Sequence, residues 1–212
     1  MPELPEVETT KRGIERLLKN KTVESTIVHQ YKFRQPIARN IGNILKSQTL
    51  RTVSRRAKYL LFNFTKGTLI IHLGMSGSLR VVSPNPPQAK HDHVEISFND
   101  NLCLRFRDPR RFGLVIWTKQ DPLKHKLLKN CGPEPLTQQF SAIYLKRVAE
   151  NRTCAIKQFI MLNNVVVGVG NIYASEALFS AGINPNRPAN SIDLEEFGQL
   201  SKSIKTVLRR AI

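Results

Sequence analysis

The sequence predicts an α+β fold: an N-terminal antiparallel β-sandwich with a flanking N-terminal helix, then a helical domain. Two observations carry this prediction. Between Thr22 and Trp117, short β-branched and aromatic runs alternate with turn-forming segments. Beyond Gln139, apolar residues recur at helical spacing almost to Ile212. A chain of 212 residues is long enough for two small domains, each with its own core.

The first element is a helix at the N-terminus. Its apolar residues recur at spacings of three, four and seven: Leu4, Val7, Ile14, Leu17 and Leu18. Charged residues lie between them, so the helix is amphipathic and has one face to bury. We expect that face to pack on the β-sandwich that follows.

The strands follow in the next hundred residues. Runs with strand character include "TVESTIVH", "KYLLFNF", "GTLIIHL", "HVEISF" and "LCLRF". Turn-forming segments such as "TKG", "SPNPP" and "NDN" separate them. Many short strands at such spacing are typical of an antiparallel sandwich or barrel.

The domain boundary falls in the segment "NCGPEPLTQQ", which combines a glycine with two prolines. We therefore divide the chain into domains 1–131 and 132–212. The helical segments of the second are "SAIYLKRVAE", "AIKQFIMLN", "NIYASEALFSAG" and "SIDLEEFGQLSKSIKTVLRRAI". Gly182 is well placed to end the third of these, and Ser191 with Glu195 resembles a capped start for the fourth.

The charge balance indicates a polyanionic partner. Lysine and arginine number 33 against 16 acidic residues, a formal net charge of +17, which favours nucleic acid over an anionic membrane surface. We expect two basic clusters to lie on turns and contact phosphates. They are Arg51, Arg55, Arg56 and Lys58, and Arg105, Arg107, Arg110 and Arg111.

Several classes of protein are disfavoured. No apolar run approaches the roughly 18 to 20 residues of a membrane span, and the N-terminus lacks the layout of a signal peptide. No basic helix has the broad aromatic face of a membrane-surface protein. Cys103, Cys131 and Cys154 form no CxxC pair, so we expect small buried residues rather than disulfides or a zinc site.

A glycine-rich turn precedes the third predicted helix. Gly168, Val169 and Gly170 end a β-branched run, and the helix begins at about Asn171. Free backbone N–H groups at such a helix N-terminus would bind an anion. Tight packing explains the two glycines equally well, and both interpretations stay open here.

The opening residues "MPELPEVETT" place carboxylates in an otherwise basic protein. If Met1 is removed, Pro2 becomes an N-terminal secondary amine, a nucleophile whose iminium adduct persists as an electron sink. Glu3 would be adjacent to this amine, and Glu6 lies one helical turn from Pro2 on the same side. Such carboxylates can relay protons to and from an amine. They would also suit a helix N-terminus without any catalytic role.

The chain resembles the bacterial formamidopyrimidine-DNA glycosylases, repair enzymes for oxidised purines. The resemblance rests on consecutive blocks across nearly all 212 residues: "MPELPEVETT", "RRAKYLL", "IIHLGMSGSLR", "KHDHVE", "DPRRFG", "CGPEPL", "AIK" and "VVVGVGNIYASEALFSAGINP". It implies a bifunctional DNA glycosylase and AP lyase that forms a Schiff base with DNA. It also implies that the helical domain contains a helix-two-turn-helix.

The resemblance implies roles for four catalytic residues. Pro2 attacks C1′ of the damaged nucleotide, Glu3 is the acid that assists base loss, and Glu6 supports the same proton network. Lys58 assists β-elimination, and we expect it in a strand entering a cleft.

The resemblance also implies the DNA contacts. Met75, Arg110 and Phe112, on two loops, enter the duplex when the base is flipped out. His91, Arg110 and Arg152 contact DNA, Asn171 lies at the helix N-terminus in the helix-two-turn-helix, and Lys157 fits the same backbone-binding surface.

One departure concerns metal. The family continues into a C-terminal zinc finger with four cysteines and an arginine that assists δ-elimination, whereas this sequence stops at Ile212. We expect no cofactor within residues 1–212, and one zinc ion only if a finger segment exists beyond Ile212.

The expected partner is double-stranded DNA containing oxidised bases or abasic sites, bound by a monomer in the bacterial cytoplasm at the nucleoid. Two alternatives stay open: an endonuclease VIII-like glycosylase for oxidised pyrimidines, and a non-catalytic protein that binds damaged DNA.

Overall fold

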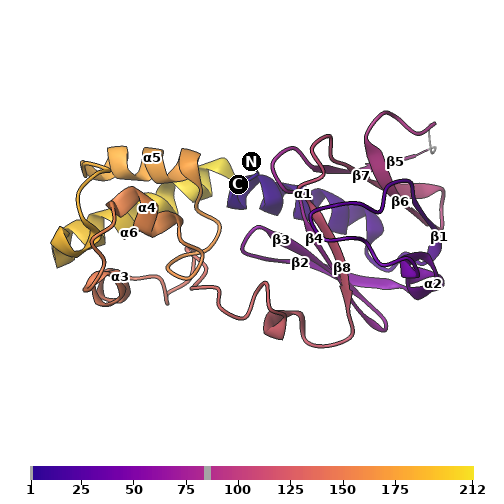
Figure 1. Ribbon diagram of the computed structural model, residues 1–212, viewed down its shortest axis with the longest axis horizontal. Helices are drawn as coiled ribbons and strands as arrows, with labels where there is room; N and C mark the ends of the chain where they lie inside the picture. Colours follow the sequence, from indigo (N-terminus) through magenta and orange to yellow (C-terminus); the bar gives the residue numbers. More distant parts are fainter. Residues whose placement is uncertain (1, 84–86) are drawn as a thin grey trace. The chain divides into compact units, whose positions relative to one another are not determined.

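The computed structural model describes residues 2–83 and 87–212. It confirms the α+β fold, with two antiparallel sheets followed by helices (Figure 1). The chain forms two compact units. The first contains Pro2 and Val7–His125, and the second contains Glu3–Glu6 and Lys126–Ile212. Met1 lies outside the described residues, and the domain boundary after residue 131 stays a prediction.

The first unit is a sandwich of two four-stranded sheets. One sheet has the order β1-β6-β7-β5, from β1 (Val23–Val28), β6 (Asp92–Phe98), β7 (Leu102–Arg107) and β5 (Ser78–Val82). The other has the order β2-β3-β4-β8, from β2 (Leu50–Arg56), β3 (Tyr59–Phe64), β4 (Gly67–His72) and β8 (Leu114–Thr118). Alternate residues of both sheets, among them Phe62 and Phe106, share one buried core, as the pleat of a half-buried strand requires.

The N-terminal helix α1 (Leu4–Leu18) packs on this sandwich through Val7, Ile14 and Leu18. Leu17 was predicted on the same face but is 47% exposed. At 100° per residue it lies about 80° to one side of the stripe that the other three form, which explains the difference. A short helix, α2 (Ile41–Leu45), and a 3₁₀ turn, η1 (Pro122–Lys124), complete the unit.

The prediction that both basic clusters lie on turns was wrong. Arg51, Arg55 and Arg56 are in strand β2, and Arg55 Nε lies 2.9 Å from Glu8 Oε2 on α1. Arg107 closes strand β7. Only Lys58, Arg110 and Arg111 of the two clusters lie outside strands.

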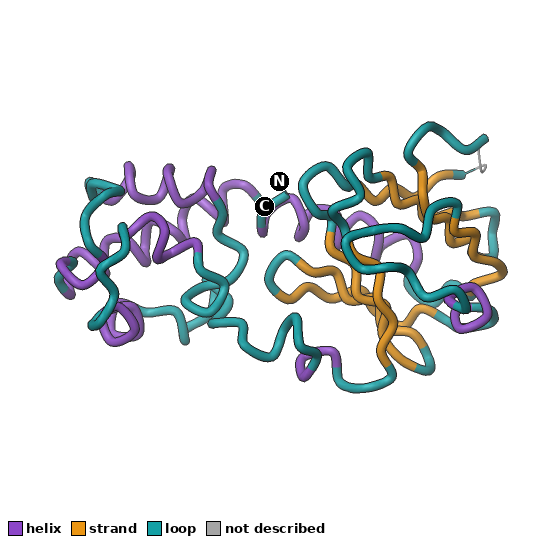
Figure 2. Tube along the Cα trace, in the orientation of Figure 1, coloured by secondary structure: helices purple, strands orange, loops and turns teal. Residues whose placement is uncertain are grey.

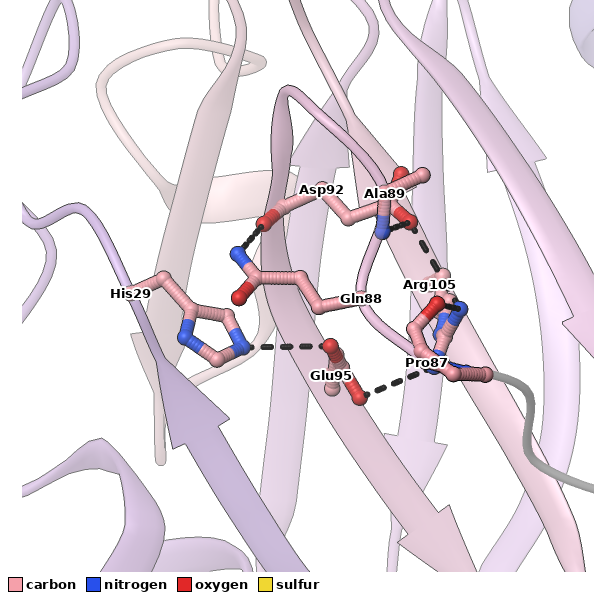
Figure 3. Close-up of polar contacts among 7 residues, drawn as sticks. All are labelled: His29, Pro87, Gln88, Ala89, Asp92, Glu95 and Arg105. Atoms are coloured by element: carbon pink, nitrogen blue, oxygen red, sulfur yellow. Dashed lines mark hydrogen bonds and ion pairs between the residues drawn. The ribbon is translucent and has the colours of Figure 1, made fainter.

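Arg105 is in β7 and is only 6% exposed. Figure 3 shows it between two carboxylates, with Nη2 at 3.4 Å from Glu95 Oε2 and Nη1 at 3.6 Å from Asp92 Oδ2. Glu95 lies directly opposite Arg105 in the register of β6 and β7, and it also contacts His29 Nε2 at 3.1 Å. A side chain committed to these carboxylates is a structural residue of the sandwich.

The second unit consists of helices and loops (Figure 2). Its helices are α3 (Ala142–Ala149), α4 (Ile156–Met161), α5 (Asn171–Ala181) and α6 (Leu194–Ala211), with a 3₁₀ turn η2 (Ala189–Ser191). Phe140, Phe159 and Phe197 are fully buried in its core, and Leu4 of the second unit packs with them. Among the described helices, none has the length and apolar character needed to cross a bilayer.

Helix ends follow local chemistry. Gly182, at φ +68°, caps the C-terminus of α5 as predicted. The predicted start of α6 was wrong, because Asp193 and Glu196 form its capping box whereas Ser191 ends η2.

The three cysteines were predicted to be small buried residues. Only Cys103 is fully buried, whereas Cys131 and Cys154 are half-buried.

Candidate active site and DNA-binding loops

The carboxylate of Glu3 sits on the N-terminus of α5. It accepts hydrogen bonds from the backbone N–H groups of Gly170, Ile172 and Tyr173, at 2.8, 3.0 and 3.4 Å. Glu3 is 3% exposed and these bonds use both of its oxygens. The prediction of free N–H groups at this helix was therefore wrong, because the anion bound there is a side chain of the chain itself.

The two glycines before α5 are required by close packing. A Cβ at Gly170 would lie 2.4 Å from Glu3 Cδ and 2.5 Å from Glu3 Oε1. Gly168 has φ +80°, and its Cβ would lie 2.7 Å from Leu4. The N–H of Leu4 donates to the carbonyl of Gly168 at 3.0 Å, so residues 3 and 4 are fixed against this turn. Of the two interpretations of the glycines, tight packing is the one that the structure supports.

Glu6 links Glu3 to α5 from the other side. Its Oε2 accepts the N–H of Glu3 at 2.7 Å, as the third residue of a helix often does for its cap. Its Oε1 accepts the hydroxyl of Tyr173 at 2.6 Å. Burial, the hydrogen bond to Glu6 and the nearby carboxylates raise the pKa of Tyr173 well above its usual range. Tyr173 therefore keeps its proton and stays a donor to Glu6.

Pro2 immediately precedes this network and is half-buried. Glu3 is held at its carboxylate and at its N–H, and its neighbour Leu4 is held as well. The residue to which Pro2 is bonded therefore has a fixed position. Removal of Met1, which lies outside the described residues, would leave a secondary amine there.

Lys58 belongs to the first unit and is 8% exposed. It was predicted in a strand, and this was wrong: it occupies the turn between β2 and β3, after Ala57 at φ +55°. Two-residue hairpin turns need positive φ, which explains why the strand ends before it.

His72 at the end of β4 lies close to this turn. Burial foremost, and then the charges of Lys58 and Arg34, lower the pKa of His72 to about 4. Its Nδ1 accepts the N–H of Gly74 at 3.0 Å, and its ring centroid is 4.8 Å from that of Tyr59. Sequence reasoning missed His72, although it stands in the segment "IIHLGMSGSLR".

Three predicted DNA contacts gather on two adjacent loops. Met75 lies in the β4–β5 turn and Phe112 in the β7–β8 loop, each 44% exposed. The Arg110 guanidinium lies 4.7 Å from the Phe112 ring centroid. Met75 and Phe112, with Arg34, His72 and Gly74, line a pocket of about 380 Å³. Large apolar side chains exposed on polar loops are typical of a binding surface.

The remaining predicted contacts are more dispersed. His91 is half-buried in the β5–β6 connection, at φ +73°. In the second unit, Arg152 is exposed after α3, Lys157 is half-buried on α4 and Asn171 is exposed at the start of α5. Among residues 2–83 and 87–212, no three His, Cys, Asp or Glu side chains form a cluster that could hold a metal ion.

Tyr173 was also missed, since no spacing in "NIYASEA" distinguishes a tyrosine that contacts Glu6 from one that only packs. The signal that could have found it is its position in the first turn of α5, beside the glycines.

Comparison with known proteins agrees with these features. Residues 1–115 match the family described as "Formamidopyrimidine-DNA glycosylase N-terminal domain", and residues 131–212 match the "Formamidopyrimidine-DNA glycosylase H2TH domain". The chain is 51% identical over 212 residues to the formamidopyrimidine-DNA glycosylases of Nitrosococcus oceani and Pseudomonas aeruginosa, spanning 78% of the length of each.

Solved structures give the same result. The Lactococcus lactis formamidopyrimidine-DNA glycosylase bound to DNA containing an AP site superposes with a TM-score of 0.91 at 33% identity, over 99% of this chain and 81% of that one. A mutant of the same enzyme bound to DNA containing Fapy-dG has a TM-score of 0.91 at 33% identity, over 100% and 78%. By sequence over both units and by fold, the chain belongs to the formamidopyrimidine-DNA glycosylase family.

Proposed function

We propose that this DNA glycosylase of base excision repair removes oxidised purines, such as 8-oxoguanine and formamidopyrimidines, and then acts as an AP lyase through Pro2. The observation that carries the proposal is the fixed Glu3, whose carboxylate is held by three N–H groups of α5 directly beside Pro2. The proposed proton-transfer partner of the Pro2 amine is thereby ordered before substrate binds.

Pro2 is the proposed nucleophile. Its nitrogen lone pair attacks C1′, the bond from C1′ to the base breaks, and the base leaves after accepting a proton. The sugar ring opens to give an iminium between Pro2 and C1′. As the nitrogen of proline carries no second hydrogen, this cation persists and accepts the electrons of the next step.

Glu3 and Glu6 are the proposed proton-transfer groups. Glu3 donates a proton as the base departs; its carboxylate then receives the proton that Pro2 loses and passes it to the ring oxygen as the ring opens. Glu6 accepts from the Glu3 N–H and the Tyr173 hydroxyl, so it fixes the start of the chain and supports the same network.

Lys58 is proposed to assist β-elimination. In that step a C2′ proton passes to a water molecule, the electrons of the C–H bond pass into the iminium, and the 3′ phosphate leaves. A lysine that is only 8% exposed, on a tight turn, suits contact with the reacting nucleotide. Elimination of the 5′ phosphate by a second step stays a prediction.

The proposed partner is double-stranded DNA containing an oxidised base or an abasic site. The related Lactococcus lactis structures contain DNA with an AP site or Fapy-dG. Met75, Arg110 and Phe112 would fill the stack after the damaged nucleotide leaves it, and His91, Arg152, Lys157 and Asn171 would contact the backbone. A monomeric state, a cytoplasmic location and the lack of a cofactor within residues 1–212 stay predictions.

The proposal is tested by covalent trapping. The protein is incubated with borohydride and a duplex carrying 8-oxoguanine opposite cytosine, after mass spectrometry has verified that Pro2 is the first residue. Borohydride reduces the iminium, so we expect a protein–DNA band on a denaturing gel, weakened or lost in Pro2→Gly. A duplex with an oxidised pyrimidine serves as the comparison substrate.

Each outcome separates the candidate functions. A stronger band with the pyrimidine duplex would favour the endonuclease VIII-like alternative. Binding of damaged DNA without any band from the free Pro2 amine would favour the non-catalytic alternative and overturn the lyase proposal.

A further inference from the structure

Asp108 is a buried carboxylate that the proposed chemistry does not use. It is 0% exposed and lies just beyond β7. Its Oδ2 accepts the N–H of Gly113 at 2.8 Å, and its Oδ1 accepts the hydroxyl of Ser76 at 2.9 Å. Gly113 and Ser76 belong to the two different loops that carry Phe112 and Met75. Burying a carboxylate costs free energy, and the hydrogen bonds that these two loops donate to Asp108 offset that cost.

Ser76 completes a bridge between the same two loops. Its hydroxyl donates to Asp108 and also accepts the backbone N–H of Arg110 at 3.3 Å. Met75 precedes Ser76 directly, so one hydroxyl connects the backbone positions of Met75 and Arg110. We call Leu73–Gly77 the Met75 loop and Asp108–Gly113 the Arg110 loop.

The backbone of Asp108 extends the connection to His91. Its N–H donates to the carbonyl of His91 at 3.1 Å. Its own carbonyl accepts the N–H of Arg111 at 3.1 Å and lies 3.1 Å from His93 Nε2. One residue therefore holds the Met75 loop, the Arg110 loop and the backbone of His91.

The two loops also touch backbone to backbone. Gly74 has φ +65°, and a Cβ there would lie 2.6 Å from the Phe112 carbonyl carbon and from the Gly113 nitrogen. A Cβ at Gly113 would lie 3.1 Å from Asp108 Oδ2. Neither loop can shift far without breaking a hydrogen bond or colliding with the other.

We propose that Asp108 and Ser76 are positioning residues that lock Met75, Arg110 and Phe112 into one preformed wedge for insertion into the DNA stack. This inference rests on the proposed DNA-binding role of those three residues. A wedge ordered beforehand does not lose loop freedom on binding, so insertion is favoured over binding to the duplex surface alone.

The test measures insertion separately from chemistry. A duplex carries 2-aminopurine next to an 8-oxoguanine opposite cytosine, so that unstacking by the wedge raises its fluorescence. We expect Ser76→Ala to lower the rate of the fluorescence rise about tenfold, since two hydrogen bonds between the loops are lost. Affinity for an undamaged duplex, which needs no insertion, should stay within about twofold. Ser78→Ala, on β5 outside the bridge, is the matched control and should behave as wild type.

A double-mutant cycle identifies the partner of Ser76. Asn at position 108 offers one acceptor oxygen where Asp offers two, so Asp108→Asn disturbs the same bridge from its other end. Ser76→Ala should therefore have a smaller effect in the Asp108→Asn protein than in wild type. Circular dichroism melts show that each variant is folded.

Each result decides one point. A fluorescence rise in a wild-type protein that removes no base would support the wedge and contradict the proposed glycosylase activity. An equal rate in Ser76→Ala and wild type, or strictly additive effects in the cycle, would overturn the inference even if the glycosylase is fully active. Absence of any fluorescence rise with wild-type protein bound to the damaged duplex would overturn it as well.

Discussion

The hydroxyl of Tyr173 donates to Oε1 of Glu6 at 2.6 Å, while the N–H of Tyr173 lies 3.4 Å from Oε2 of Glu3. One residue of α5 thus contacts both carboxylates that follow Pro2. The helix N-terminus holds Glu3 through the backbone, and Tyr173 holds Glu6 through its side chain. The proposed acid and its supporting carboxylate are therefore fixed by the same turn of helix.

Tyr173→Phe tests this arrangement. Loss of the hydroxyl leaves Glu6 with one donor fewer, so we expect the single-turnover rate of 8-oxoguanine removal to fall about tenfold. The free energy of unfolding should fall by about 1.5–3 kcal/mol, as for a hydrogen bond to a charged acceptor. Because the pKa of Tyr173 is raised, its phenol stays protonated in wild type. The wild-type rate should therefore exceed the Tyr173→Phe rate by the same factor at every pH up to about 9.

Tyr144→Phe is the matched control for this prediction. Tyr144 also donates a hydrogen bond in the second unit, at 2.8 Å to the carbonyl of Val165, so its hydroxyl proton serves the backbone rather than Glu3 or Glu6. This variant should lose about 0.5–1.5 kcal/mol of stability, as for a hydrogen bond to a neutral acceptor, and keep its rate. Equal rate losses in both variants would show that Tyr173 acts through stability alone.

Gly170→Ala is expected to disrupt the active site. The new Cβ would lie 2.4 Å from Glu3 Cδ, so the carboxylate must leave the N–H groups of α5. We expect about 1–3 kcal/mol less stability, as for overpacking, and loss of borohydride trapping by at least about tenfold. Chemical denaturation and the trapping gel measure the two effects.

Gly198→Ala is the control for Gly170→Ala, and it should raise stability rather than lower it. Gly198 lies within α6, and a Cβ added there would meet no atom of the surrounding structure within 4 Å. Alanine is the better helix former, so this variant should gain about 0.5–1 kcal/mol and trap DNA as wild type does. Trapping by Gly170→Ala at the wild-type level would contradict the proposed role of Glu3.

The sequence predicted the elements whose signal is local. The alternation in "KYLLFNF" and the glycine at position 182 identify a strand and a helix end without tertiary information. Strand β2 was missed because Arg51, Arg55 and Arg56 give it the character of a basic cluster, and Glu8, the partner of Arg55, is 47 residues away in sequence. Arg105 was misinterpreted for the same reason, since only the register of β6 against β7 places Glu95 opposite it.

The candidate site was predictable only in its residue types. "PELPE" indicated a nucleophile with neighbouring carboxylates and "GVGN" indicated an anion-binding site, but nothing local shows that Glu3 itself is the anion on α5. Asp108 and Ser76 carried no signal, because their importance comes from which loops they join. Long-range pairing of this kind is set by the fold, which local propensity does not encode.

His72 gives stability a pH dependence. Its pKa is about 4 in the folded chain, compared with 6.5 for an ordinary histidine, because burial and the charges of Lys58 and Arg34 disfavour the imidazolium. The unfolded chain then binds a proton first as pH falls. The stability contribution is complete above about pH 6.5 and is lost between there and about pH 4, by up to about 3 kcal/mol.

His72→Asn isolates this contribution. Asparagine can still accept the N–H of Gly74 but does not titrate, so its free energy of unfolding should fall less than that of wild type between pH 7 and pH 4.5. Urea denaturation at both pH values measures the difference. Parallel pH profiles for the two proteins would show that His72 titrates normally in the folded state.

Arg105 should contribute to the stability of the fold, whereas Arg152 should contribute to DNA binding. Arg105 is buried between Glu95 and Asp92, whereas Arg152 is exposed after α3. Arg105→Ala would leave buried carboxylates without this partner, so we expect about 3–5 kcal/mol less stability. At a temperature where Arg105→Ala is still folded, its DNA affinity should keep the wild-type dependence on salt.

Arg152→Ala should instead keep wild-type stability and lower the slope of log K against log salt by about 1, the loss of one phosphate contact. Denaturation curves and binding titrations between 50 and 200 mM salt, roughly the range over which such slopes are resolved, measure both. A reduced slope for Arg105→Ala would show that Arg105 contacts a DNA phosphate and would contradict its structural role.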